Sequence, residues 1–239
     1  MKADAILDAL WPRRCEICGS ACDRLGRHVC SACLMRLPFA GLDGCCRVCG
    51  REVEGFRGEY LCEDCEKRPP AFDRVASALR FEDPARTLVL QYKSSGRVWL
   101  AADFADWVEA AARARFDVAA ADAVLPMPVT PAHRMDRGYN PSALLAKDVA
   151  ARIGRAFAAD VLSRRGNPRR QAGLSEEERR ENVKGTFAVL RPELVRGRTL
   201  LVVDDVMATG STLSECARSL KAAGASRVLC ATLARSVRT

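Results

Sequence analysis

Two adjacent aspartates at the end of an apolar run are the residues of this sequence best suited to chemistry. The run TLLVVDD, residues 199–205, is apolar on both faces, which is typical of a central strand in a parallel sheet. Such a strand delivers Asp204 and Asp205 to its carboxyl end, where ligands bind in open α/β sheets. The sequence therefore predicts an acidic ligand site at this edge of a sheet.

A turn of small residues follows the aspartates, and a helix is predicted to begin after it. The turn consists of Ala208, Thr209, Gly210, Ser211 and Thr212. Small side chains let backbone N–H groups approach a phosphate, hydroxyls add donors, and a helix N-terminus favours negative charge. An ordinary strand–turn–helix junction with capping hydroxyls would look similar. Two carboxylates beside such a cradle also suit the hydroxyls of a sugar, so the pattern favours a sugar-phosphate site.

Eight cysteines form a repeated pattern of pairs separated by two residues. The first half holds Cys15, Cys18, Cys30 and Cys33, and the second half holds Cys46, Cys49, Cys62 and Cys65. Zinc prefers four tetrahedral ligands, and a two-residue spacer lets both thiolates of a pair face one ion. We therefore predict two structural zinc ions, because four thiolates leave no open position for catalysis. Sequential and cross-braced pairings both fit, and the contiguous repeat favours the sequential one.

Cysteine use also indicates the compartment. Ten of the twelve cysteines lie between Cys15 and Cys65. In a secreted chain this crowding would indicate disulfides, but residues 1–11 predict a short amphipathic helix rather than a secretory signal. We expect a reducing, cytoplasmic setting with metal-bound thiolates. No apolar run approaches the roughly 20 residues that a membrane-spanning helix requires, so membrane insertion is not expected.

The order of predicted elements divides the chain into three parts. Residues 1–11 form the short helix, residues 12–68 a double zinc ribbon, and residues 71–239 an α/β domain. In the last part strands and helices alternate, which predicts a parallel sheet with helices on both faces. Strands are predicted at 75–79, 121–126, 199–205 and 227–234, and helices at 84–92, 98–116, 142–153, 174–182 and 212–223. We expect loss of one zinc ion to unfold one ribbon and leave the α/β domain intact.

At residues 202–212 the sequence resembles the type I phosphoribosyltransferases, whose signature is an apolar strand, two acids and a Thr-Gly loop. The resemblance implies that Asp204 and Asp205 are the catalytic pair that holds the ribose hydroxyls of phosphoribosyl pyrophosphate. It implies that residues 208–212 wrap the 5′-phosphate and that the turn at Met127 contacts the diphosphate. Magnesium would bridge the ribose and diphosphate oxygens, mostly through the ligand and water.

Over nearly its whole length the chain is similar to the ComF family. The motifs that carry this similarity are, in order, the zinc repeat, QYKSSG at 91–96, LPMP at 125–128, HRMDRGYN at 133–140, Gln171-x-x-Leu174-x-x-x-x-Arg179-x-x-Asn182 and VVDDVMATGST. The ordered set is specific, whereas no single middle motif is. Their place in this set makes Lys93, Arg134 and Arg137 candidate diphosphate contacts. Pro141 departs from the family pattern, which has Gln there.

The family resemblance implies a type I phosphoribosyltransferase-like domain after a double zinc ribbon, and a link to DNA uptake in naturally transformable bacteria. One function it suggests is transfer of ribose 5-phosphate from phosphoribosyl pyrophosphate to a nitrogen nucleophile. The alternative is non-catalytic sensing of that ligand by a protein that handles single-stranded DNA with other competence proteins. Ala208 weighs against purine salvage, because purine-salvage members of the fold have an aspartate base at the equivalent loop position.

Charge is distributed unevenly along the chain, whose formal net charge is +8. Residues 1–70 hold 11 Lys/Arg and 11 Asp/Glu, so zinc-bound thiolates would make this part negative. Electrostatics dominates non-specific affinity for nucleic acid, which makes the ribbons poor sole binders. The basic segment 164–184 is either a solvated loop or a mobile hood over the ligand. We expect any binding of single strands to depend more on Arg164, Arg165, Arg169 and Arg170 than on the ribbons.

Overall fold

The computed structural model describes residues 12–41, 43–53, 55–165 and 175–236 of the 239-residue chain. The helix expected at 1–11 lies outside the described residues. The helices are α2 (Ser31–Leu34), α3 (Glu63–Lys67), α4 (Ala85–Ser94), α5 (Ala101–Arg115), α6 (Pro131–Arg137), α7 (Pro141–Ile153), α8 (Glu176–Val183) and α9 (Ser211–Ala222). The strands are β1 (Cys45–Cys46), β2 (Glu59–Tyr60), β3 (Arg74–Arg80), β4 (Ala123–Pro126), β5 (Ala156–Phe157), β6 (Leu162–Arg164), β7 (Phe187–Val189), β8 (Thr199–Met207) and β9 (Arg227–Arg235). None of the described helices is long and apolar enough to cross a membrane.

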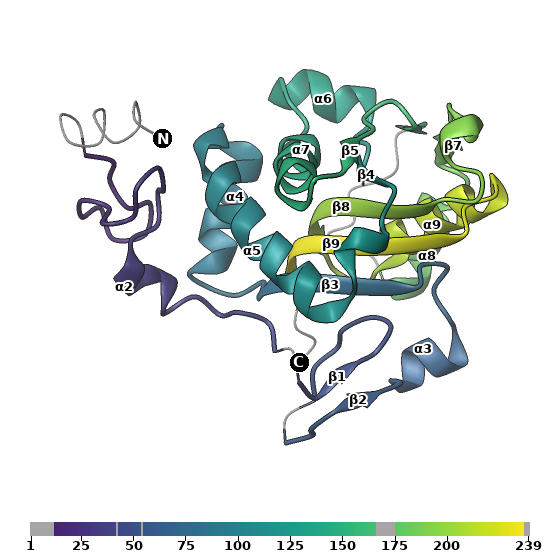
Figure 1. Cartoon of the computed structure of the whole chain (residues 1–239), viewed down its shortest axis with the longest axis horizontal. Helices are drawn as coiled ribbons and strands as arrows, with labels where there is room; N and C mark the ends of the chain where they lie inside the picture. Colours follow the sequence, from purple (N-terminus) through teal and green to yellow (C-terminus); the bar gives the residue numbers. More distant parts are fainter. Residues whose placement is uncertain (1–11, 42, 54, 166–174, 237–239) are drawn as a thin grey trace.

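A parallel sheet forms the centre of the α/β part, in the order β3-β9-β8-β4-β5. Every neighbouring pair in it is parallel. Helices α4, α5 and α7 lie on one face and α8 and α9 on the other (Figure 1). The predicted fold class is therefore confirmed. β8 lies between β9 and β4 and is buried over most of its length, which explains its apolar character on both faces.

The two faces of the sheet belong to two separate hydrophobic cores. Alternate residues of a strand point to opposite faces, so Leu201 and Val203 enter the core that contains Phe104 of α5. Leu200 and Val202 enter the core on the α9 side, which also contains the fully buried Cys216 and Cys230. Cys216 and Cys230 are therefore packed as small apolar side chains in the core.

Each zinc ribbon extends a different one of these cores. Cys15, Cys30 and Cys33 of the first ribbon pack in the core that contains α5, whereas Cys46, Cys49, Cys62 and Cys65 pack in the core that contains α9. Each ribbon therefore shares a hydrophobic core with the α/β domain, which the sequence did not predict. A ribbon has too few apolar residues to form a core of its own, so it shares one with its neighbour.

The chain that joins the two ribbons covers the outer edge of the sheet. Ala40 N donates to Ala78 O at 2.9 Å, and Arg80 N donates to Pro38 O at 2.8 Å, so this segment pairs with β3. Further along the same edge, Val75 N donates to Val48 O of the second ribbon at 2.9 Å. The backbone groups that an edge strand would expose are thereby satisfied.

Buried polar groups fix the first ribbon to the sheet. The carboxylate of Asp103 in α5 is fully buried and accepts from Arg24 Nη1 at 2.9 Å and from His28 N at 2.8 Å. Burial raises the pKa of Asp103, partly offset by the His28 amide and the Arg24 charge. The pair therefore specifies where the ribbon docks more than it adds stability, because burying the carboxylate costs free energy.

Two arginines fix the second ribbon in the same way. Arg115 of α5 donates to Cys46 O at 2.8 Å, and Arg235 at the end of β9 donates to Cys49 O at 2.5 Å. Both side chains are buried, at 8% exposure each. The backbone carbonyls of two predicted zinc ligands, Cys46 and Cys49, are thus hydrogen-bonded to elements of the α/β domain.

Several elements differ from those that the sequence predicted. The segment expected as one helix at 98–116 begins with a 3₁₀ turn at Val98–Leu100 before α5. Helix α6, strand β5 and the antiparallel pair β6–β7 were not predicted. α6 is short and buries none of its side chains, and β5, β6 and β7 have two or three residues each, so neither type shows a periodic apolar pattern. Ser175 caps α8 through a capping box.

Candidate functional site

The two aspartates lie next to each other at the carboxyl end of β8. Asp204 is 9% exposed and Asp205 is 5% exposed. The Asp204 carboxylate accepts from Ser142 Oγ at 2.9 Å and from the Asp205 backbone N–H at 2.9 Å. The Asp205 carboxylate accepts from Lys93 Nζ at 2.9 Å. One carboxylate is therefore held by neutral donors and the other by a cation.

Burial and neighbouring charges shift the pKa values of Asp204 and Lys93. Burial and, secondarily, the neighbouring negative charge of Asp205 raise the pKa of Asp204 to about 6. Burial tends to lower the pKa of Lys93, but the Asp205 carboxylate outweighs it, so the pKa of Lys93 is raised. Lys93 is therefore a firmly charged group in contact with the acidic pair, and 28% of its side chain is exposed for contact with a ligand.

Four of the sequence motifs meet at this edge. Tyr139 Oη donates to the backbone oxygen of Tyr92, which joins the HRMDRGYN motif to QYKSSG. Asn140 Nδ2 donates to Met127 O at 3.0 Å, which joins the HRMDRGYN motif to the LPMP turn. Ser142, directly after them, reaches Asp204. The ordered motifs of the sequence thus form a single hydrogen-bonded structure around the carboxylates.

The departure at Pro141 has a structural explanation. Pro141 is the first residue of α7, where a missing N–H is not required by the helix and the fixed φ is already helical. Its carbonyl accepts from Tyr92 Oη at 2.8 Å. Asn140 caps the helix by accepting from Ser142 N at 3.0 Å. Ser142 itself was not among the predicted site residues, and its position at a helix start gave no signal of its bond to Asp204.

The small-residue turn forms a tight loop between β8 and α9. Gly210 has φ +83°, and a Cβ placed on it would lie 2.9 Å from Met207 Cε. Only glycine fits this position without strain. Thr209 Oγ1 and Ser211 Oγ are 2.7 Å apart, so both hydroxyls lie on the same side of the loop, and a small hollow there is lined by Asp204 and residues 206–213. The loop has the small residues and the donors of a phosphate cradle.

The basic candidates are not equally close to the acids. Arg137 influences the pKa of Lys93, which places it in the electrostatic neighbourhood of the acidic pair, whereas Arg134 is exposed on α6. Arg164 of β6 stacks its guanidinium 5.3 Å from the centre of the Phe187 ring. Burial lowers the pKa of Arg164, opposed by the charge of Asp204. Arg164 therefore lies within electrostatic reach of Asp204, while Arg169 and Arg170 lie outside the described residues.

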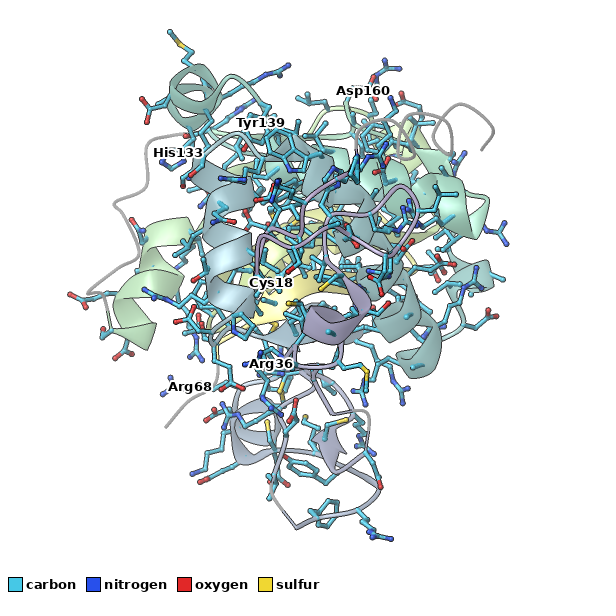
Figure 2. All side chains as sticks on the ribbon, turned by 90° about the vertical axis from the view of Figure 1, so that its left-hand side faces the viewer. Cys18, Arg36, Arg68, His133, Tyr139 and Asp160 are labelled. Carbon is cyan, nitrogen blue, oxygen red and sulfur yellow. The ribbon has the colours of Figure 1, made fainter. Side chains whose placement is uncertain are left out.

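The eight paired cysteines form two groups in the sequential arrangement. Within each group the four sulfur atoms lie within 4.8 Å of one another, and the groups are Cys15, Cys18, Cys30, Cys33 and Cys46, Cys49, Cys62, Cys65. The distance from Cys18 Sγ to Cys30 Sγ is 3.8 Å, and that from Cys49 Sγ to Cys62 Sγ is 3.6 Å. A tetrahedral zinc with bonds of about 2.3 Å separates its sulfurs by about 3.8 Å, so both groups fit structural zinc. Only Cys18 is exposed, at the surface of the first ribbon (Figure 2).

Family models match both parts of the chain. The model of the double zinc ribbon domain matches residues 6–66, and that of the phosphoribosyl transferase domain matches residues 140–238. The parallel sheet, the cysteine tetrads and these matches define a double zinc ribbon protein with a phosphoribosyltransferase domain.

Two relatives place the chain in one family within this class of proteins. Competence protein F of Haemophilus influenzae is 27% identical over 231 residues, which cover 93% of this chain and 97% of the relative. DNA utilization protein YhgH of Salmonella typhimurium is 30% identical over 220 residues, which cover 84% of this chain and 96% of the relative. The chain belongs to the ComF family, as its ordered motifs predicted.

Solved structures with a similar arrangement are more distant. Glutamine phosphoribosylpyrophosphate amidotransferase from B. subtilis, complexed with ADP and GMP, has 18% identity and a TM-score of 0.40. The match covers 59% of this chain and 30% of the amidotransferase chain. Hypoxanthine-guanine phosphoribosyl transferase of L. donovani has 17% identity and a TM-score of 0.34, over 58% of this chain and 68% of that one.

The zinc assignment predicts a graded loss of metal. Elemental analysis should find about two zinc ions per purified chain, and Cys62→Ser should retain about one. Because the second tetrad packs in the α9-side core, Cys62→Ser should also lower the thermal midpoint of the whole chain. Cys22→Ser, which changes a cysteine outside both tetrads, is the matched control and should keep two. A metal content unchanged by Cys62→Ser would contradict the assignment.

The raised pKa of Asp204 predicts that ionisation of this carboxyl group lowers the free energy of unfolding. The folded state holds its proton more tightly than the unfolded state, so this group destabilises the fold progressively as pH rises from about 4 to about 6. Asp204→Asn removes that cost and should increase the free energy of unfolding at pH 8 by about 1–3 kcal/mol. Denaturant titrations should show the gain shrinking as pH falls below 6. Asp160→Asn, at an exposed position, should show no such gain.

Proposed function

We propose that the domain built on the parallel sheet binds phosphoribosyl pyrophosphate at the carboxyl end of β8. The observation that carries this proposal is the meeting of an acidic pair, a charged lysine and a phosphate cradle at one edge. Asp204 and Asp205 offer acceptors, Lys93 offers a cation, and residues 208–212 offer donors. A sugar with vicinal hydroxyls, a terminal phosphate and a diphosphate matches all three chemistries.

Each part of the site has a distinct task in this proposal. The carboxylates of Asp204 and Asp205 accept hydrogen bonds from the two ribose hydroxyls, which orients C1. The 5′-phosphate occupies the hollow beside Thr209 and Ser211, where the N-terminus of α9 adds a favourable field. Lys93 turns toward the incoming diphosphate, and the backbone at Met127, fixed by Asn140, forms the opposite wall. Arg137 is a further diphosphate contact and Arg134 a peripheral one.

Magnesium fits the donor set of this edge. Carboxylate, phosphate and ribose oxygens are the hard ligands that Mg²⁺ prefers, and it keeps several waters. When bound with the ligand it would neutralise charge on the diphosphate. The chain's own share is to hold the ligand that carries the ion.

Transfer chemistry would break the bond between C1 and the diphosphate oxygen and form a bond from C1 to a nitrogen nucleophile. The diphosphate leaves with the electron pair, and the nucleophile loses its proton to solvent or a base. Ala208 cannot accept that proton, so the loop supplies no base. A transferase of this chain would therefore use an acceptor nitrogen that needs no base, or a base from outside the loop. A chain without an acceptor would be a sensor of the ligand.

The names of the relatives support a setting in DNA handling. They are called competence protein F and DNA utilization protein YhgH. We propose that this chain acts with DNA or with other competence proteins in the cytoplasm. The reducing compartment would keep its eight paired thiols available for zinc.

Ligand binding can be tested by thermal shift. Phosphoribosyl pyrophosphate with Mg²⁺ should raise the midpoint of the wild type by mass action, by several degrees at saturating ligand. Asp204→Ala combined with Asp205→Ala should abolish the shift, since the ribose acceptors are gone. Gly210→Val should abolish it too, because a β-branched residue at a φ of +83° strains the loop that would hold the phosphate. Asp160→Ala is the control and should keep the full shift.

An undiminished shift in the double variant would place the ligand elsewhere on the chain. Where the shift follows the expectation, release of diphosphate in the presence of nitrogenous bases and amines identifies a transferase. Binding without release under every acceptor identifies a sensor.

The DNA proposal has its own test. The affinity for an oligothymidine strand should fall with salt, and the triple variant Arg165→Ala, Arg169→Ala, Arg170→Ala should flatten this salt dependence. Phe39→Ala with Phe56→Ala removes the partly exposed stacking candidates of the ribbon region, at 41% and 46% exposure, and should change the affinity less. The reverse order of effects would assign strand binding to the ribbons.

A further inference from the structure

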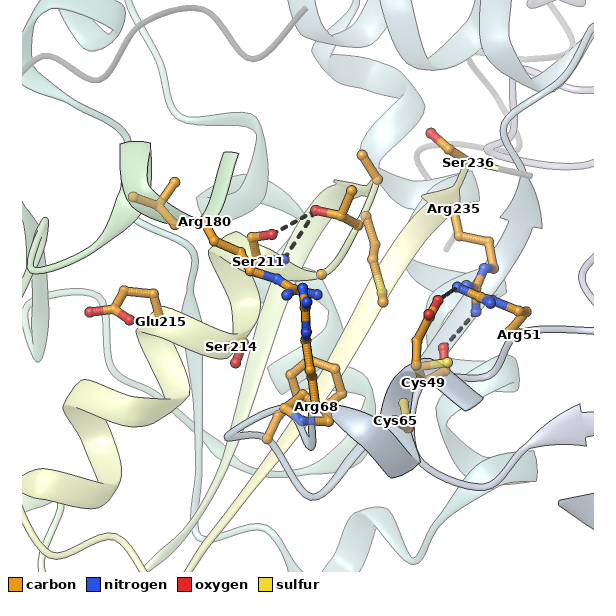
Figure 3. A pocket seen from close by; sticks show the side chains of 18 of the residues that line it. Cys49, Arg51, Cys65, Arg68, Arg180, Ser211, Ser214, Glu215, Arg235 and Ser236 are labelled. Carbon is orange, nitrogen blue, oxygen red and sulfur yellow. Dashed lines mark hydrogen bonds and ion pairs between the residues drawn. The ribbon is translucent and has the colours of Figure 1, made fainter. Parts of the chain in front are cut away.

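A large cavity among the described residues lies beside the acidic pair of the proposed ribose site. It has a volume of about 710 Å³ and lies between the second ribbon, the loop after β8 and helices α8 and α9 (Figure 3). This volume is typical of sites for small organic ligands and exceeds what an inorganic phosphate would fill. Neither Asp204 nor Asp205 lines it, although residues 208–211 of the proposed phosphate cradle do.

The walls of this cavity are strongly basic. Seven cationic and four acidic side chains line it, which leaves a net charge of +3. Five of the cations have partners inside the protein, in the pairs Arg51–Asp64, Arg80–Glu52, Lys184–Glu181, Arg218–Glu215 and Arg235–Cys49 O. These five side chains therefore already have partners within the protein and are less available to a ligand.

Arg68 and Arg180 differ from the other five. In the described part of the chain neither side chain makes a hydrogen bond or ion pair. They come from opposite walls, Arg68 from the end of α3 and Arg180 from α8, and both side chains extend into the cavity (Figure 3). Two guanidinium groups that share a cavity repel each other unless an anion lies between them. Their planar forks match phosphate oxygens in bidentate fashion.

The remaining walls complete a site for more than a bare anion. Ser214 Oγ accepts from Ala71 N at 3.0 Å, so its own hydroxyl hydrogen is available to a ligand. Phe72, Val183 and Met207 supply apolar surface beside the arginines. A ligand that joins a charged phosphate group to a larger, less polar part suits this combination.

We propose that this cavity is a second ligand site, which binds a phosphorylated nucleoside through Arg68 and Arg180. It shares the loop residues 207–211 with the hollow beside Asp204, so the loop separates two neighbouring sites. One wall of the second site is the zinc ribbon and the other is α8. The bound ligand therefore ties the ribbon to the helix that precedes β7.

The site can be tested by titration of the full chain with ADP as the probe. The wild type should bind ADP with a dissociation constant below about 1 mM. Arg68→Ala combined with Arg180→Ala should weaken binding at least about tenfold, because both phosphate contacts are lost. Arg68→Lys with Arg180→Lys should recover part of it, since charge returns without the bidentate geometry.

Two controls separate this cavity from the ribose site and from unfolding. Asp204→Ala with Asp205→Ala should retain ADP affinity within about threefold, whatever its effect on phosphoribosyl pyrophosphate. Arg191→Ala removes an exposed arginine outside the cavity and should change neither affinity nor thermal midpoint. Because the side chains of Arg68 and Arg180 have no hydrogen-bond or ion-pair partner among the described residues, their double alanine variant should also keep the wild-type midpoint.

The proposal is overturned by any of three results. These are the absence of measurable ADP binding to the wild type, ADP affinity unchanged in the Arg68 and Arg180 variant, and loss of ADP binding in the aspartate variant alone. A strand of oligothymidine that binds through these arginines while ADP does not would likewise assign the cavity to nucleic acid and overturn the nucleotide site.

Discussion

Two carboxylates buried side by side at the end of a strand impose the constraint on which this structure depends. Burial makes a negative charge on Asp204 costly, and the neighbouring carboxylate of Asp205 adds to that cost. Lys93 supplies a countercharge, and Ser142 supplies a neutral donor. These two residues come from α4 and α7, so both helices must be placed against one end of β8. The hydrogen bonds among the motif loops maintain that placement.

The zinc ribbons belong to the same structure rather than to an appendage. Sulfur ligands are buried with aliphatic and aromatic side chains in both cores, so the metal sites stand in for the apolar residues that a short segment lacks. The buried anchors Asp103, Arg115 and Arg235 then determine the docking position. Because the second ribbon also forms a wall of the basic cavity, its metal and the proposed nucleotide site depend on one another structurally.

The sequence predicted the sheet, the zinc tetrads and the loop after β8 because each leaves a strong local pattern. β8 is apolar on both faces, the cysteine pairs repeat, and the turn at 208–212 consists of small residues. Contacts between distant segments left no such pattern. The bond from Ser142 to Asp204 joins residues 62 positions apart, and the cavity brings Arg68 near Arg180 only because the ribbon folds back on the sheet. The cores that the ribbons share with the α/β domain were not predicted for the same reason, since local spacing carries no sign of them.

The segment at Pro38–Ala40 has a consequence for how this molecule can meet other proteins. It occupies one margin of the sheet, and the opposite margin is β5, which has only two residues. A sheet bounded in this way offers little backbone for a foreign strand to join. Complexes of this chain must then be built through side chains and loops. Substitutions that release the joining segment would expose unpaired backbone N–H and C=O groups of β3. Their first effect would therefore be self-association rather than loss of ligand binding.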